Sequence, residues 1–137
     1  MGKYEKYIVK PFDWGERPLI GHNRKVMNEL GPLMAFLNED MVKDTDLDVF
    51  IHFIDVKSDD GPEYVEPHVH DFSQAYIFPE NGLTFEVELD GEKYVKESPI
   101  TVFIPAGVRH TIRMIKGKGF EVSLTRTAKY HWDESKS

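Results

Sequence analysis

The feature that most constrains the fold of this chain is a succession of short strand-like runs separated by turn residues. In Leu83–Leu89, apolar residues alternate with Thr or Glu at every second position. Such alternation is typical of a strand with one buried face. Asp90-Gly91 follows directly, and Glu92–Val95 comes next. Because Asp-Gly between two such runs is the strongest short-range indication of a β-hairpin, we predict an antiparallel pair here.

Other segments repeat this pattern along the chain. Leu47–Val56 and Ile100–Ile104 are rich in β-branched and aromatic residues, which predicts further strands. Thr111–Ile115 and Phe120–Thr125 flank Lys116–Gly119, which predicts a second hairpin. Strands with regular turns and no long helical period are typical of a β-sandwich or barrel, so we expect an all-β fold.

The N-terminal part of the chain is less regular. Tyr4–Val9 could form an edge strand, Val26–Leu30 a helical turn that ends at Gly31-Pro32, and Leu33–Leu37 another strand. The sequence shows no internal repeat, low-complexity tract or linker. A chain of 137 residues without such a boundary is expected to form one domain.

Charge and composition exclude several classes of function. The chain has 17 Lys and Arg against 24 Asp and Glu, a formal net charge of −7. Such a balance argues against binding to nucleic acid or to an anionic membrane surface. The absence of cysteine excludes disulfides and thiolate ligands. Because the sequence has neither an apolar leader nor a run of 18 apolar residues, we expect a soluble cytoplasmic protein.

Candidate metal ligands stand at strand spacing in the middle of the chain. His68 and His70 are two positions apart, so on a strand both side chains point to one face, and Gln74 keeps the same parity. His110 follows the Pro105-Ala106-Gly107 turn and can open a later strand that returns toward them. Three imidazoles and one amide oxygen suit a divalent first-row metal and leave coordination positions open, as in catalytic sites.

These residues also carry a family resemblance. Pro67-His68-Val69-His70-Asp71-Phe72-Ser73-Gln74 resembles the first motif of the cupin superfamily, whose closing Gly is matched by Gly82, one position late. Pro105-Ala106-Gly107-Val108-Arg109-His110 resembles the second motif, Pro-x-Gly-x-x-His. The two motifs occur in the expected order and at a cupin-like separation.

The resemblance implies a cupin-type double-stranded β-helix, or jelly-roll barrel, with a metal ion inside. Residues 1–137 would form a single domain, with N-terminal strands and loops at 1–46, the barrel core at 47–126 and a tail at 127–137. It also implies a homodimer. The expected ligands of one divalent transition metal are His68, His70, Gln74 and His110. The identity of the metal stays open among Fe, Zn, Ni, Mn and Co.

The sequence departs from the family pattern at three positions. Pro99 stands where the second motif usually begins with Gly, and Met114 where it usually ends with Asn. Gln74 stands where Glu is commoner. Because Gln is neutral, the ion would keep its full +2 charge, which makes it a stronger Lewis acid and a less tightly bound one. Gln74 could instead orient a histidine or a water by hydrogen bonding.

Two further residues are candidates for catalysis, each with a simpler interpretation. Tyr76 shares the parity of the histidines, so its phenol could donate to a substrate oxygen, although Tyr at such a position commonly belongs to the core. Arg109 could bind a substrate carboxylate at the barrel mouth or form a surface ion pair. His52 is expected to be a packed, hydrogen-bonded histidine. His22 and His131 are expected at the surface or at an interface.

Three classes of function fit these observations. The first is a metal-dependent enzyme that acts on a small oxygenated molecule, by Lewis-acid isomerisation or ketonisation or by iron-dependent dioxygenation. The second is a small-molecule-binding or sensor barrel without turnover. The third is a structural or partner protein whose metal only holds the barrel, although structural sites are usually coordinatively filled. We favour the enzyme.

Overall fold

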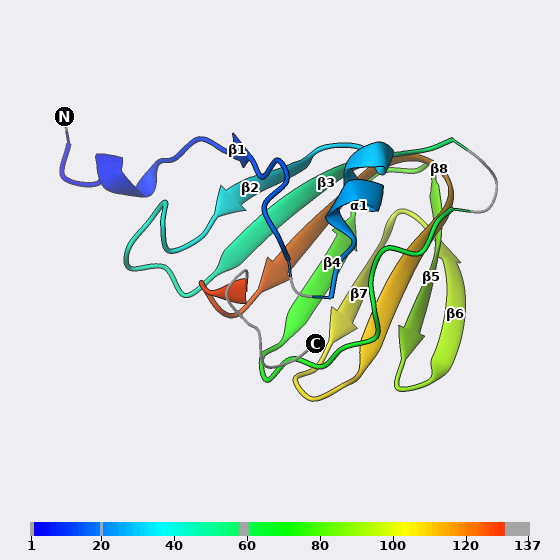
Figure 1. Ribbon diagram of the computed structural model, residues 1–137. Helices are drawn as coiled ribbons and strands as arrows, with labels where there is room; N and C mark the ends of the chain where they lie inside the picture. Colours follow the sequence, from blue (N-terminus) through cyan, green and yellow to red (C-terminus); the bar gives the residue numbers. More distant parts are fainter. Residues whose placement is uncertain (1, 20, 58–60, 131–137) are drawn as a thin grey trace.

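Antiparallel β-strands make up most of the regular structure of this chain. The computed structural model describes residues 2–19, 21–57 and 61–130, and Figure 1 shows how their elements are arranged. Two helical elements precede most of the strands: the 3-10 helix η1 (Glu5–Tyr7) and the helix α1 (Arg24–Leu30). The strands are β1 (Phe12–Asp13), β2 (Leu33–Leu37), β3 (Asp48–Val56), β4 (Gln74–Phe78), β5 (Leu83–Leu89), β6 (Glu92–Glu97), β7 (Ile100–Ile104) and β8 (His110–Thr125).

The strands hydrogen-bond in the order β1-β2-β3-β8-β4-β7, and β5 joins β6 to β8. The long strand β8 connects the two groups, because its first half pairs with β5 and its second half pairs with β3 on one edge and β4 on the other. Every pairing is antiparallel. The expected all-β jelly-roll architecture is confirmed.

The predicted hairpin at Asp90-Gly91 is confirmed. Leu89 pairs with Glu92, and the two turn residues have φ of 52° and 89°. Positive φ at both central positions is the backbone conformation that Asp-Gly and Asn-Gly supply in two-residue hairpin turns. The predicted bounds of β2, β5 and β7 also match the structure.

The second predicted hairpin, at Lys116–Gly119, is wrong. The chain continues through these residues as part of β8 and changes partners there: Gly117 pairs with both Leu83 and Val56. Gly117 has φ of 102°, and a Cβ at this position would lie 1.8 Å from the carbonyl oxygen of Gly82. Gly117 therefore lets β8 pass close to the backbone of Gly82, and it does not form a chain reversal.

The N-terminal expectations are partly met. Val26–Leu30 lies within α1. Asn23 caps the N-terminus of this helix, and its side chain accepts a hydrogen bond from the backbone N–H of Val26. The edge strand expected at Tyr4–Val9 is wrong, because η1 forms there through hydrogen bonds between residues three apart along the chain. No helix among the described residues is long and apolar enough to span a membrane.

The interior is apolar at one end and polar at the other. Phe78, Phe85 and Met114 are among the fully buried side chains. Adjacent positions across β3, β8 and β4 instead carry polar side chains that point inward: Asp48, His52, Gln74, Glu121, Ser123 and Thr125. Because buried polar groups are costly unless they are hydrogen-bonded or bind something, this polar end marks the candidate site.

Candidate metal centre

A reciprocal backbone pair holds His68 against His110. The N–H of His68 donates to the carbonyl of His110 at 3.0 Å, and the N–H of His110 donates to the carbonyl of His68 at 2.9 Å. Directly opposed residues of an antiparallel pair place their side chains on the same face. The two imidazole centroids accordingly lie 4.4 Å apart. His68 lies in this isolated bridge and His70 in the loop after it, rather than on the regular strand that the spacing suggested.

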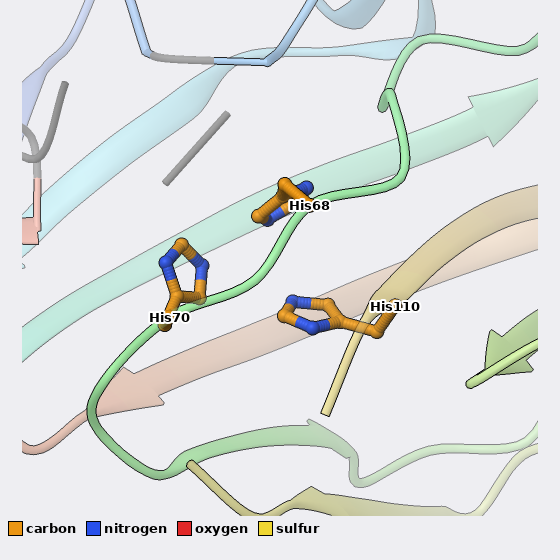
Figure 2. A group of neighbouring side chains, drawn as sticks. All are labelled: His68, His70 and His110. Carbon is orange, nitrogen blue, oxygen red and sulfur yellow. The ribbon is translucent and has the colours of Figure 1, made fainter. Parts of the chain in front are cut away.

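His70 completes a triad with these two residues. Its carbonyl accepts a hydrogen bond from the N–H of Gly107, so the Pro-x-Gly turn is tied to the first motif. Its ring centroid lies 4.6 Å from that of His68 and 5.2 Å from that of His110. Figure 2 shows the three rings pointing toward one another. One ring nitrogen from each lies within 4.8 Å of the others, so these three residues could hold a metal ion, as predicted.

Backbone carbonyls fix the orientation of two of the rings. The Nδ1 of His68 lies 2.6 Å from the carbonyl oxygen of Glu66, and the Nδ1 of His110 lies 2.9 Å from that of Val108. Because a carbonyl oxygen only accepts hydrogen bonds, each Nδ1 carries the proton and each Nε2 keeps its lone pair. This second hydrogen bond on the ring is the usual support for a metal-binding histidine.

The triad is electrically suited to bind a cation. Burial lowers the pKa of His70 to about 3, with His68 and His110 adding to the effect. Burial likewise lowers the pKa of His110 to about 4, against an opposing hydrogen bond to Val108. Both imidazoles are therefore neutral at pH 7. Neutral imidazole is the form that coordinates a metal.

Gln74 is buried at the start of β4. Its amide Nε2 donates to the hydroxyl oxygen of Ser123 at 3.0 Å. Its Oε1 is also buried and has no hydrogen-bond partner among the described residues, as is true of Nε2 of His110. A carbonyl oxygen and an imidazole nitrogen in this state fit a divalent ion. Coordination by Gln74 itself stays a prediction.

A small cavity of about 20 Å³ lies near the triad, although none of the three histidines lines it. It has room for about one water molecule. Three of its wall residues lie next to predicted metal ligands: the ring centroids of His22 and His68 are 5.6 Å apart, those of Tyr130 and His70 are 5.2 Å apart, and Ser123 accepts a hydrogen bond from Gln74. His22 was expected at the surface or an interface but is half-buried beside the triad. His131, given the same expectation, lies outside the described residues.

The two candidate catalytic residues lie in different environments. Tyr76 is buried in the cavity wall, and burial raises the pKa of its phenol well above the usual value. Arg109 is exposed in the loop between β7 and β8, where its carbonyl accepts a hydrogen bond from the N–H of Asp90. Arg109 is not among the residues that line the cavity. Catalytic roles for both stay predictions.

Two other residues of the cavity wall are titratable and face each other across a strand pair. His52 is buried as expected, and its Nε2 lies 3.0 Å and 3.1 Å from the carbonyl oxygens of Met27 and Gly31. Burial lowers the pKa of His52 to about 4. Its partner on β8 is Glu121, whose carboxyl group the sequence analysis did not single out. Burial raises the pKa of Glu121 to about 8.

Comparison with solved structures assigns the architecture. A search of protein-family models gave no match, and neither did a search of curated proteins. An RmlC-like cupin from Shewanella frigidimarina is 21% identical, with a TM-score of 0.51 over 73% of this chain and 80% of the other. KdgF from Halomonas sp. is 19% identical, with a TM-score of 0.53 over 70% of this chain and 77% of the other. This chain has the cupin fold.

The cupin fold extends over nearly the whole chain in a third comparison. A variant of the oxalate decarboxylase OxdC from Bacillus subtilis is 11% identical, and the match covers 93% of this chain and 31% of the decarboxylase, with a TM-score of 0.54. Because the same fold carries many chemistries, function has to be argued from the site. In this chain the candidate site consists of the histidine triad, the Gln74 amide and the neighbouring cavity.

Proposed function

We propose that this cupin is a metal-dependent enzyme that acts on a small oxygenated organic molecule. The observation that carries the proposal is the triad of His68, His70 and His110, with ring nitrogens within 4.8 Å of one another. Two of the rings are held by carbonyls so that Nε2 faces the site. A divalent ion held there would polarise a carbonyl or enol oxygen as a Lewis acid.

Among the possible reactions we favour isomerisation or ketonisation. Gln74 is neutral, so a ligand set of three imidazoles and one amide leaves the charge of the ion uncompensated, which favours stabilisation of a developing enolate oxygen. Tyr76 lies in the cavity wall and keeps its proton, so it can donate a hydrogen bond to a substrate oxygen. Arg109, exposed outside the cavity, would contribute only by contacting a substrate that extends to the barrel mouth.

The first test is the metal content of the protein purified without added metal or chelator. We expect about one divalent ion per chain, lost in His110→Ala because three imidazole ligands would become two. The matched control is His52→Gln, which changes a buried histidine outside the triad. It should keep the metal even if the melting temperature falls. Wild-type protein that stays metal-free after incubation with each candidate metal would contradict the proposal.

The metal found in this preparation, and its response to added ligands, distinguish isomerisation from dioxygenation and from binding without turnover. Iron together with oxygen consumption on addition of a diketone would indicate dioxygenation, since a three-histidine face leaves positions for substrate and oxygen. Zinc, nickel or manganese without oxygen consumption supports isomerisation. Thermal stabilisation by a ligand without any turnover would indicate a non-catalytic binding barrel.

A further inference from the structure

Glu121 is the only carboxylic acid among the described residues that line the cavity. Its side chain is 7% exposed, and its Oε2 is buried without a hydrogen-bond partner among the described residues. None of those lining residues is Lys or Arg, so no cation in the wall compensates a negative charge there. A buried carboxyl group without a partner is destabilising unless it serves a ligand or a reaction.

The position of Glu121 ties it to the metal centre. Ser123 lies two residues further along β8 on the same inward face and accepts the hydrogen bond from Gln74. Tyr76 pairs with Ser123 across the strands and also lines the cavity. The space between these side chains holds about one water molecule, which can carry a proton between Glu121 and a substrate bound at the triad.

We propose that Glu121 is the acid–base residue of this site and transfers a proton to and from the carbon of a small, uncharged hydroxyketone or enol. The assignment rests on the proposed function and names its substrate class. An uncharged substrate fits because no Lys or Arg lines the cavity to bind a carboxylate.

The proton transfer balances without a further reactant. In ketonisation, the Glu121 carboxyl group gives its proton to the water in the cavity while that water gives a proton to the α-carbon of the enol, so the carboxyl O–H bond breaks and a C–H bond forms. The enol O–H proton then passes through the same water to the Glu121 carboxylate and restores the acid. No electron is gained or lost, and the reverse sequence exchanges the α-protons of a ketone with solvent.

The titratable groups that face Glu121 come from several segments. They are His22 before α1, His52 on β3, Tyr64 after β3, Tyr76 on β4 and Tyr130 after β8. Burial raises the pKa of Glu121 to about 8, whereas that of His52 is lowered to about 4. At pH 7 Glu121 therefore holds its proton and His52 is neutral. Removal of an α-proton needs the carboxylate, so the exchange rate should rise with pH as Glu121 ionises.

The test is solvent deuterium exchange into hydroxyacetone, followed by proton NMR, with the zinc-loaded protein. Zinc excludes redox chemistry. Acid–base groups contribute about 10²–10⁴-fold, so Glu121→Gln should slow exchange at least about 100-fold and abolish the pH-dependent rise. Gln resembles a protonated Glu in shape, so zinc content and melting temperature at pH 6 should be unchanged. Glu121→Asp should recover part of the rate.

Two controls make the outcomes distinguishable. Glu86→Gln removes a half-buried carboxyl group on β5 outside this cavity and should exchange like the wild type. His68→Ala with added zinc gives the background rate. If wild type exceeds that background and Glu121→Gln matches wild type, the assignment of Glu121 is overturned while the proposed function stands. If the zinc-loaded wild type does not exceed the background, the proposed function and this assignment both fail.

Discussion

The hydrogen bond between Gln74 and Ser123 decides which atom of Gln74 is available to a metal ion. Because Nε2 donates to the Ser123 hydroxyl, the carbonyl oxygen Oε1 is left as the accepting end of the side chain. This is a property of two single residues on adjacent strands, β4 and β8. It can be changed without altering the triad.

If Gln74 is a ligand, Gln74→Glu should tighten metal binding by at least about tenfold, which corresponds to about 1.4 kcal/mol. The added carboxylate compensates part of the ionic charge, whereas in the metal-free protein it is a buried charge that should lower the melting temperature. Ser123→Ala should weaken binding by about tenfold, because the amide loses its orienting partner. Competition titration with a chromophoric chelator measures both effects. Equal affinity in wild type and Gln74→Glu would refute ligation by Gln74.

At the scale of the elements, β8 is the strand that connects the two groups of strands in the barrel. Its bend at Gly117 lets one strand of 16 residues pair with β5 first and with β3 and β4 later. His110 at its start and Glu121 beyond the bend are both buried on the inner face as a result.

Gly117→Ala should therefore destabilise the fold strongly. Its Cβ would overlap the Gly82 carbonyl oxygen, at a distance of 1.8 Å, and its φ is positive. We expect a loss of at least about 3 kcal/mol in the free energy of unfolding, measured by urea denaturation of the metal-free protein. The matched control is Gly91→Ala, which also has positive φ but no atom within 4 Å of the added Cβ. It should cost about 1–2 kcal/mol. Equal losses would show that the contact with Gly82 is unimportant.

At the scale of the whole molecule, the outer face of the strands β2-β3-β8-β4-β7 carries mostly apolar side chains. One row across five strands contains Phe103, Ala75, Leu124, Val49 and Leu37, and the next contains Thr101, Ile77, Val122, Ile51 and Met34. None of these side chains is fully buried, and only Thr101 is polar. Phe103 and Thr101 are exposed and the other eight are half-buried, so the face presents contiguous apolar side chains, which are typical of an interaction site. Two copies with a net charge of −7 each can meet over this uncharged face without opposing like charges.

We therefore expect a homodimer formed through this outer face. Phe53→Asp combined with Phe103→Asp changes two exposed apolar residues of the sheet and should weaken association at least about 100-fold. Tyr94→Asp, on β6 away from these rows, should leave the dimer intact. Sedimentation velocity over a range of concentrations measures both. A wild-type chain that stays monomeric throughout would contradict the expectation, and association only with another protein would indicate a different partner.

The sequence alone determined the features that depend on near neighbours in the chain. Alternation over Leu83–Leu89 and the Asp90-Gly91 turn predicted a hairpin, because side-chain period and turn conformation are local properties. The triad was also predicted from the two histidine motifs, although His68 lies in an isolated bridge and His70 in a loop rather than on one regular strand. The jelly-roll topology followed from the cupin resemblance.

Only the tertiary structure decided which face of a strand turns inward and where a strand changes partners. In Phe120–Thr125 the polar residues Glu121 and Ser123 are buried, whereas Val122 and Leu124 lie on the outer face. Taken alone, the alternation of this segment would place its polar residues in solvent. The packing of β8 between β3 and β4 reverses that choice, because inward positions there surround a polar site and the outer face is apolar. Such a reversal depends on residues far apart in the sequence, which is why Glu121 was found only in the folded chain.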